Sequence, residues 1–489
     1  MKISALLKSA GYAVPLLKED KTVTGVTDDS RRVCGGEVFV AVDGLHQNGA
    51  AYAAEATGKG AVLVVCEHPI EGLPVLTVPN ARAAFARLAA AFWEHPERAM
   101  TFIGITGTNG KTTTAAMLAH ILRAAGRHVG LIGTVGNSVD GEPLPVKSGN
   151  ALANMTTPDP GELYHLHALM RERGADTVVM EVTSHALAFS KTEPIFFKRA
   201  VFTNLTPDHL DLHGDMERYF GEKCKLFTRC EQAILSLSTV YGERLASLYP
   251  NALTLGSNDL ENIDSTADGV RFTLLTATEP LTVFIPIPGT FIVENGALAA
   301  LTALSLGVAP TVICDALGTF AGVPGRMERV ARNPLDIRIF IDYAHTPDAL
   351  EKLLLSARSF RRHGERILLL FGCGGDRDRS KRAEMGRIGS RLSDLLILTS
   401  DNCRSERPAD ILADILKGVD KERPYRVIED RAEAIAYAVA AADPGDVVLL
   451  AGKGHENYEI RGDKRLPFSE KAIAEAAVAK RLRESSDAH

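Results

Sequence analysis

Short apolar runs, each followed by a stretch with helical spacing, recur through the middle of this 489-residue chain. Residues 176–181 form an apolar run that ends in a carboxylate, and residues 199–204 form one that ends in an asparagine. Residues 101–103 are apolar ahead of a glycine-rich turn and the helical pattern of residues 115–123. Strands that alternate with helices are typical of a parallel sheet, so the pattern predicts an α/β fold.

The same rhythm divides the chain into three regions, as its length also suggests. Residues 1–98 contain short β and α pieces, including the β-type runs 38–42 and 61–65. We expect this region to be a small N-terminal domain. A central domain would follow at residues 99–328, and a C-terminal domain at residues 329–489.

One predicted helix, residues 216–227, has a lysine on its apolar face. Three- and four-residue spacing places Tyr219, Lys223, Leu226 and Phe227 on that face. A lysine held among apolar groups loses its proton more readily than one in water. Lys223 is therefore a candidate for a functional role.

Polar clusters follow four predicted strands of the last region. These strands are residues 337–341, 367–371, 395–398 and 447–450. The ends of parallel strands open on one crevice, so we expect this domain to bind a charged ligand. Arg377, Arg404 and Glu456 would suit a zwitterion, with the arginines on a carboxylate and the glutamate on an amine. Residues 374–377 could also be a second phosphate loop, but the usual lysine and hydroxyl do not follow them.

The composition of the chain limits the partners that it is expected to bind and the cellular compartment in which it is expected to lie. A formal net charge of −6 gives no general attraction to nucleic acid or an anionic membrane. Lys8 breaks the first apolar run, and no later run approaches membrane-spanning length, which predicts a cytoplasmic protein without membrane insertion. The 7 scattered cysteines lack CxxC spacing, which argues against a disulfide framework or a zinc site.

The glycine-rich turn has the composition of a phosphate-binding loop. Residues 107–113 read Gly-Thr-Asn-Gly-Lys-Thr-Thr ahead of a helix. In such a turn backbone N–H groups converge on phosphate oxygens, with Lys111 as the cation and Thr112 as a magnesium ligand. Ile105 stands where the general P-loop pattern has its outer glycine, so the shortened form carries the prediction of ATP binding. The alternative is a glycine-rich turn that binds no nucleotide.

Further magnesium ligands are expected at neighbouring strand ends. Glu181 ends one predicted strand and His209 follows another. Carboxyl ends of parallel strands open on the crevice where the phosphates would lie, so both are candidates. Arg326, at a hinge-like exit from the central region, is placed to reach a nucleotide.

Six motifs, in this order and at this spacing, resemble those of the Mur ligases over nearly the whole chain. They are residues 107–113, 180–185, 204–213, 324–328, 342–345 and 452–456. The resemblance implies an ATP-dependent amide ligase of peptidoglycan precursor synthesis. It also implies a small N-terminal UDP-binding domain, a central P-loop-type parallel-sheet ATPase domain and a C-terminal Rossmann-like domain.

The resemblance implies the site residues as well. ATP would meet Gly107, Thr108, Asn109, Gly110, Lys111, Thr112, Thr113, Asn295, Arg326 and Asp342. Mg²⁺ would be held by Thr112, Glu181, His209 and a carbamylated Lys223, and the catalytic group would be Lys111, Glu181, His209 and Lys223. The UDP-linked acceptor would meet Ser30, Thr156, Thr157, Thr183 and Lys191. The incoming amino acid would meet Arg377, Asp401, Asn402, Cys403, Arg404, Gly452 and Glu456.

Residues 156–159, 372–379 and 401–404 resemble segments of the members that add the third amino acid to UDP-N-acetylmuramoyl-L-alanyl-D-glutamate. In those members, an arginine at the place of Arg404 accompanies meso-diaminopimelate, whose second carboxylate needs a cation. The implied reaction passes through an acyl phosphate, in a monomer whose C-terminal domain closes over ATP. Alternatives are the L-lysine-adding version, a neighbouring Mur ligase, a folylpolyglutamate synthetase, and a non-catalytic nucleotide-binding protein.

The chain departs from the family pattern at several positions. Cys403 replaces a proline, Ile292 an asparagine and Lys191 an arginine. Residues 468–471 also differ from the usual Asp-Asp-Arg form. Lysine cannot bind an anion through two parallel hydrogen bonds as arginine does, so the acceptor contacts implied for Lys191 would differ from those of an arginine there. A thiol beside Arg404 would have a lowered pKa if it lay in the amino-acid pocket, and we hypothesise that Cys403 is such a thiol.

Overall fold

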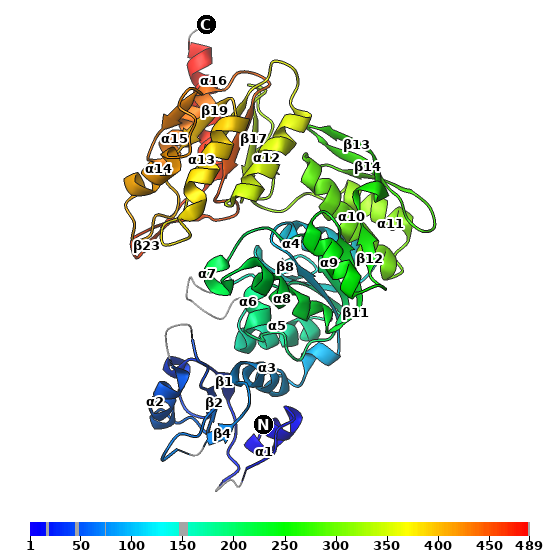
Figure 1. Ribbon diagram of the computed structural model, residues 1–489, viewed down its shortest axis with the longest axis vertical. Coiled ribbons are helices and arrows are strands. Elements are labelled where there is room, and N and C mark those ends of the chain that lie inside the picture. Colours follow the sequence, from blue (N-terminus) through cyan, green and yellow to red (C-terminus); the bar gives the residue numbers. More distant parts are fainter. Residues whose placement is uncertain (16–18, 45–47, 74, 146–154, 488–489) are drawn as a thin grey trace.

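The computed structural model describes residues 1–15, 19–44, 48–73, 75–145 and 155–487. Three α/β units follow one another along the chain, each around its own sheet (Figure 1). The α/β class with a parallel sheet in each unit is therefore confirmed, whereas the boundaries at 98 and 328 remain predictions. No helix in the described ranges is long and apolar enough to cross a membrane.

The first unit has four parallel strands in the order β1-β2-β3-β4. Its strands are β1 (Gly25–Thr27), β2 (Glu37–Val40), β3 (Leu63–Cys66) and β4 (Val75–Thr77). Its helices are α1 (Ile3–Ser9), α2 (Ala53–Gly58) and α3 (Ala81–Phe92), with 3₁₀ turns η1 (Ser30–Arg32), η2 (Gly49–Tyr52) and η3 (Pro96–Arg98). Apolar side chains of α1 and α3 cover one face of the sheet. Asn80 begins α3 by accepting a hydrogen bond from the backbone N–H of Ala83.

The central sheet has eight strands in the order β12-β11-β10-β5-β9-β6-β7-β8. They are β5 (Thr101–Thr106), β6 (Val129–Gly133), β7 (Gly136–Val139), β8 (Glu142–Pro143), β9 (Thr177–Glu181), β10 (Phe197–Phe202), β11 (Cys230–Ser236) and β12 (Leu253–Leu255). Neighbouring strands from β12 to β6 pair in parallel, whereas at the edge β7 pairs antiparallel with β6 and β8 pairs antiparallel with β7. Because β9 and β10 flank β5, the carboxyl ends of these three parallel strands lie next to one another at one edge of the sheet.

Helices cover both faces of this sheet. They are α4 (Lys111–Ala124), α5 (Pro160–Glu172), α6 (Ser184–Ala188), α7 (Leu210–His213), α8 (Met216–Phe227), α9 (Val240–Leu248), α10 (Thr290–Ser305) and α11 (Pro310–Gly318). Helix α8 has the predicted limits, and its predicted face of Tyr219, Lys223, Leu226 and Phe227 is buried.

A small antiparallel sheet, which the sequence analysis did not predict, precedes α10. The 3₁₀ turn η4 (Ser257–Asp259) leads into β13 (Leu260–Thr266), β14 (Gly269–Leu274) and β15 (Leu281–Ile285). Most side chains of β13 are exposed, so the strand carries little apolar periodicity. Its partner β14, and β15 beyond it, pack their apolar side chains into the core that α4 and α10 also line.

The third unit has six strands in the order β16-β17-β21-β18-β19-β20. They are β16 (Glu328–Arg329), β17 (Arg338–Asp342), β18 (Ile367–Phe371), β19 (Leu395–Leu398), β20 (Tyr425–Val427) and β21 (Val447–Ala451), and a hairpin of β22 (Tyr458–Arg461) and β23 (Lys464–Pro467) follows. The helices are α12 (Pro347–Phe360), α13 (Ser380–Leu392), α14 (Pro408–Leu416), α15 (Arg431–Ala441) and α16 (Glu470–Asp487). The four predicted strands are adjacent and parallel, so their polar ends share one edge.

Candidate active site

The turn between β5 and α4 has the backbone of a phosphate cradle. Gly107 has a φ of 149°, and a Cβ there would collide with the Thr203 hydroxyl. Gly110, the N-cap of α4, has a φ of 85°, and a Cβ there would collide with the Asn295 side chain. Only glycine fits both positions, which keeps the backbone N–H groups open at a helix N-terminus, where anions bind.

The Lys111 side chain folds over this turn. Its Nζ lies 2.9 Å from each of the carbonyl oxygens of Gly107 and Thr108. Burial lowers the pKa of Lys111, and the carboxylates of Glu181 and Asp208 oppose that shift. Asp208 was not singled out from the sequence, although it belongs to the polar segment after β10. The structure thus places the Lys111 ammonium and the carboxylates of Glu181 and Asp208 around the turn that is predicted to bind phosphate.

Glu181 is buried at the end of β9, next to the predicted magnesium threonine. Thr112 Oγ1 donates to Glu181 Oε2 at 2.9 Å. Thr134 donates its backbone N–H to Glu181 Oε1 at 2.8 Å and its hydroxyl to Oε2 at 3.1 Å. A Cβ on Gly133 would collide with the same carboxylate. The sequence analysis did not predict Thr134, although its position directly after an apolar strand could have indicated it.

The Thr112 and Glu181 oxygens form a donor set that fits Mg²⁺. Magnesium is usually held by one or two such oxygens together with substrate phosphates and water. His209 is half exposed, and its Nε2 lies 3.4 Å from Asp208 Oδ2. Among the described residues no three His, Cys, Asp or Glu side chains are grouped to hold a metal ion. The participation of His209 therefore remains a prediction.

Lys223 reaches the phosphate loop from underneath. It is 2% exposed, and its Nζ lies 2.9 Å from the Gly107 carbonyl oxygen and 4.8 Å from the centre of the Tyr219 ring. Burial holds the pKa of Lys223 well below its usual value, and the charge of Lys111 lowers it further. The neutral amine is the nucleophilic form of lysine. By contrast, Lys225 is exposed and paired with Glu222.

Residues of the third unit and its linker reach the phosphate loop. Arg326 Nη2 lies 3.4 Å from Thr112 Oγ1, and its guanidinium lies 4.5 Å from the centre of the Tyr343 ring. Asn109 Nδ2 donates to Asp348 Oδ2 at 2.8 Å, which joins the loop to the start of α12. The structure therefore connects the central and third units at the loop itself.

Asn295 and Asp342 were also predicted to lie near the nucleotide. Asn295 contacts α4 within the central unit, whereas Asp342 contacts the linker. Asn295 Oδ1 accepts from the Thr114 hydroxyl at 3.3 Å. Asp342 is buried and accepts from the backbone N–H groups of Met327 and Ala344, both at 2.8 Å. Burial raises the pKa of Asp342, although Arg326 and these hydrogen bonds oppose that shift.

The linker packs directly on a loop of the third unit. Gly325 has a φ of 67°, and a Cβ there would collide with the backbone of Gly454 and His455. The Gly325 N–H donates to Glu328 Oε2 at 2.8 Å. Two backbones can approach this closely only where the residue has no side chain.

A cleft of about 540 Å³ lies between the first and central units. Its lining residues include Asp28, Asp43, Tyr52, Arg82, Asp159 and Lys191. Lys191 Nζ lies 2.8 Å from Asp159 Oδ1 and donates to the Thr157 carbonyl at 3.2 Å. Ser30 is not a lining residue, since its buried hydroxyl donates to Glu55 at 3.2 Å, so its acceptor contact remains a prediction.

Three predicted acceptor threonines connect this cleft to the phosphate loop. Thr157 Oγ1 donates to the Glu181 carbonyl at 2.9 Å and lies 3.3 Å from the Thr183 hydroxyl. Thr156 Oγ1 lies 3.0 Å from the Thr134 hydroxyl, which itself contacts Glu181. Hydroxyl groups thus extend from the Glu181 carboxylate towards the cleft.

The predicted amino-acid residues gather at the ends of β18, β19 and β21. Arg404 has a φ of 51°, and its Nη1 donates to the Gly375 carbonyl at 2.8 Å. Asn402 Nδ2 donates to Glu456 Oε2 at 2.7 Å. Burial raises the pKa of Glu456. An arginine and a glutamate from different strand ends therefore belong to one cluster.

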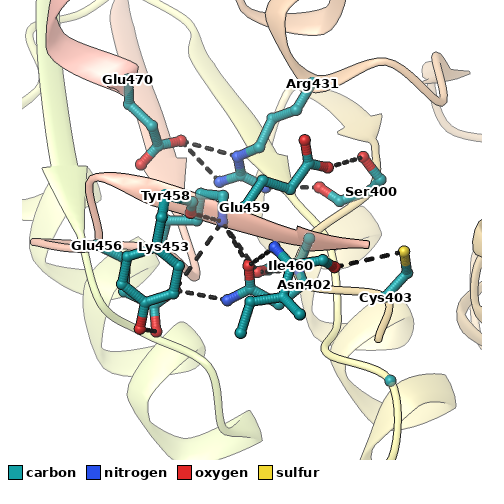
Figure 2. A network of polar contacts seen from close by, with 12 residues as sticks. Ser400, Asn402, Cys403, Arg431, Lys453, Glu456, Tyr458, Glu459, Ile460 and Glu470 are labelled. Atoms are coloured by element: carbon teal, nitrogen blue, oxygen red, sulfur yellow. Dashed lines mark hydrogen bonds and ion pairs between the residues drawn. The ribbon is translucent and has the colours of Figure 1, made fainter. Parts of the chain in front are cut away.

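The other predicted members lie in the same loops. A Cβ on Gly374 would lie 3.7 Å from Arg377 Cγ, and one on Gly452 would lie 2.9 Å from Asp401 Oδ2. Sequence reasoning did not assign Lys453 to the site, although it lies inside a quoted motif. Its buried Nζ donates to Asn402 Oδ1 at 3.0 Å, which fixes how that amide faces Glu456 (Figure 2).

The hypothesis of a reactive Cys403 thiol is wrong. Cys403 is 5% exposed and its Sγ points at the Ile460 carbonyl of β22, 3.7 Å away (Figure 2). Burial raises the pKa of the thiol, and the neighbouring Glu459 adds to the shift. The side chain therefore faces the hairpin and the core, and the arginines beside it in the sequence do not activate it.

We expect alkylation to distinguish the cysteines of the folded protein. Iodoacetamide should label the exposed Cys34 and leave Cys403 unmodified, because only an accessible thiolate reacts. Peptide mass spectrometry before and after unfolding in guanidinium chloride measures the extent of labelling at Cys34 and at Cys403. Fast labelling of Cys403 in the folded state would restore the reactive-thiol hypothesis.

Family models match two parts of the chain. The Mur ligase middle domain matches residues 105–304, and the Mur ligase glutamate ligase domain matches residues 325–454. A UDP-N-acetylmuramoyl-L-alanyl-D-glutamate--2,6-diaminopimelate ligase of Clostridium botulinum is 38% identical over 98% of this chain and 99% of its own length. The protein of the same name from Gloeobacter violaceus is 40% identical with the same coverage.

Solved structures match the whole fold. A UDP-N-acetylmuramoyl-L-alanyl-D-glutamate--2,6-diaminopimelate ligase structure superposes with a TM-score of 0.70 at 28% identity, covering 99% of this chain and 100% of that one. The MurF ligase of Thermotoga maritima, solved with ADP, superposes with a TM-score of 0.62 at 20% identity over 94% of this chain and 98% of that one. The second likeness concerns the fold alone.

Proposed function

Because the chain belongs to the Mur ligase family, we propose that it is the ATP-dependent ligase that adds meso-diaminopimelate to UDP-N-acetylmuramoyl-L-alanyl-D-glutamate in peptidoglycan synthesis. One observation carries the proposal. Lys111, Thr112 and Glu181 lie together at the phosphate loop. Arg326 reaches this place from the linker, and Asp348 reaches it from the third unit. The acceptor cleft lies between the first and central units, and the amino-acid cluster lies in the third unit.

The first chemical step would take place at the phosphate loop. A carboxylate oxygen of the D-glutamate attacks the γ-phosphorus of ATP, the bond to ADP breaks, and an acyl phosphate forms. Lys111 and the loop N–H groups would stabilise the negative charge on the transferring phosphoryl oxygens. Mg²⁺, held by Thr112 and Glu181, would neutralise phosphate charge when bound.

The second step would join the amino acid. Its amine attacks the acyl carbon, the bond to phosphate breaks, and the nitrogen loses a proton to give the amide. Arg404 would bind the distant carboxylate of meso-diaminopimelate as a bidentate fork, and Glu456 would bind an ammonium group. The residues of this step come from the third unit, so it depends on how that unit meets the central one.

Lys223 is proposed to be carbamylated, as the family resemblance implies. Its neutral amine would add to carbon dioxide, forming an N–C bond and releasing a proton. The product is an anion in place of a buried neutral amine beside Lys111. That change would place a negative charge next to the Lys111 ammonium and provide a further oxygen ligand for magnesium.

An amino-acid panel tests the choice of substrate. With ATP and the UDP-linked acceptor, we expect incorporation of meso-diaminopimelate and ADP release that requires both substrates. The variant Arg404→Met should lower kcat/KM for meso-diaminopimelate about 100-fold, because a bidentate charged pair is worth roughly 3 kcal/mol. Product mass spectrometry and coupled ADP assays measure both results.

The control variant is Arg407→Met, since Arg407 lies in the same loop but is exposed and forms an ion pair with Asp410. It should keep the wild-type kcat/KM. Incorporation of L-lysine but not meso-diaminopimelate would favour the lysine-adding version instead. ADP release that needs neither acceptor nor amino acid would refute the ligase proposal and favour a simple nucleotide-binding protein.

A further inference from the structure

One arginine lies beneath the two loops that carry most of the amino-acid cluster. Arg431 is the first residue of α15 and is 0% exposed. Its Nη1 donates to the Ser400 carbonyl at 3.1 Å (Figure 2). Its Nη2 donates to the Ala451 carbonyl at 2.8 Å. Ser400 directly precedes Asp401, and Ala451 directly precedes Gly452. The guanidinium therefore spans the starting points of both loops.

A glutamate from the last helix completes this contact. Glu470 begins α16, and its side chain is 2% exposed. Its Oε1 lies 2.9 Å from Arg431 Nε and 2.8 Å from Arg431 Nη2 (Figure 2). A buried guanidinium needs such a counterion, because an unpaired charge in the core is strongly destabilising. Glu470 also belongs to the segment that departs from the family pattern.

Above this pair the two loops are connected through their side chains. Lys453 from one loop donates to Asn402 of the other, and Asn402 donates to Glu456. A change in the distance between the loop backbones would therefore displace Asn402 relative to Glu456. Arg404, two residues beyond Asn402, would move with it.

We propose that Arg431, neutralised by Glu470, is a positioning residue that sets the spacing of the two loops of the amino-acid pocket. The inference rests on the proposed function of that pocket. Arginine suits the role because its planar fork presents donors at fixed angles to two carbonyl oxygens. A lysine ammonium would keep the charge but could not hold both carbonyls in the same geometry.

The substitution Arg431→Lys separates positioning from stability. It keeps the buried ion pair with Glu470 and removes the rigid two-carbonyl contact. We expect KM for meso-diaminopimelate to rise about 10-fold, as loss of one hydrogen bond from a charged group predicts. KM for ATP and for the UDP-linked acceptor should change by less than about twofold, because their residues lie on other elements.

A second pair of variants measures how the Arg431–Glu470 ion pair affects Tm and KM for meso-diaminopimelate. Glu470→Gln should lower Tm and raise KM for meso-diaminopimelate, whereas Glu475→Gln on the exposed face of α16 should do neither. In the double variant Arg431→Met with Glu470→Leu, both charges of the pair are removed, so neither is left buried without its partner and Tm should recover. Its KM for meso-diaminopimelate should stay high, because the carbonyl contacts are still absent.

Two results would overturn the inference: recovery of both Tm and KM in the double variant, or an equal rise of all three KM values in Arg431→Lys. If Glu470→Gln does not fold, Arg431→Lys and the double variant still decide the question. A wild-type enzyme that incorporates only L-lysine would refute the proposed substrate, and the same KM comparison would then be made with lysine.

Discussion

Replacement of Lys111 by methionine should lower kcat about a thousandfold, the loss that follows removal of one preorganised group from a developing oxyanion. The Lys111 ammonium lies over the turn where the phosphates are proposed to bind, within 2.9 Å of two loop carbonyls. Methionine has a similar shape and no charge. A coupled ADP assay measures kcat, and calorimetry should show that the UDP-linked acceptor still binds with its wild-type affinity.

The matched control for this change is Lys198→Met. Lys198 lies on β10, is nearly half exposed, and pairs with Glu231 away from the loop. Exposed ion pairs contribute little, so its kcat and Tm should stay near the wild-type values. A Lys111→Met enzyme with more than a tenth of the wild-type kcat would exclude the proposed role of the ammonium.

Replacement of Glu181 by glutamine should raise the magnesium concentration needed for half-maximal binding of a non-hydrolysable ATP analogue by about 100-fold. Loss of a group that supports a metal site typically costs 10–100-fold in affinity, and Glu181 is proposed to be a direct ligand. The amide can still accept from Thr134, so the fold should survive. Fluorescence titration of the analogue at several magnesium concentrations measures the shift, and kcat should fall by a similar factor.

A strand farther along the same sheet offers a control. Glu231→Gln on β11 makes the same chemical change at a half-exposed carboxylate that contacts Lys198 and Arg199. It should leave the magnesium titration unchanged. An unaltered titration in Glu181→Gln would show that the metal is held elsewhere and would reject Glu181 as a ligand.

Strong local patterns made much of the central unit predictable. The apolar runs before the phosphate loop and before Glu181 form adjacent strands, because parallel strands joined by helices place their carboxyl ends at one edge. Lys223 was predicted on an apolar face from spacing alone, and it is buried there. Each of these strands, and the apolar helix face, depends on residues close together in the sequence.

Features that depend on distant residues could not be predicted in the same way. Strand β13 has mostly exposed side chains and is defined by its partner β14, so its own sequence carries little signal. Cys403 lies between polar residues that suggest a reactive thiol, but β22, far along the chain, covers it. Arg431 and Glu470 meet only through tertiary packing.

The close approach of Gly325 to Gly454 limits how the third unit can rotate. A Cβ on Gly325 would collide with the backbone of Gly454, so the linker is packed against the loop that follows β21, and we expect a swing of the unit to have its axis near that loop. Residues beside the axis, such as His455, would travel a short distance. The outlying helix α14 would travel much farther (Figure 1). Interdomain distance probes should therefore be attached to α14, where the same angular change produces the larger displacement.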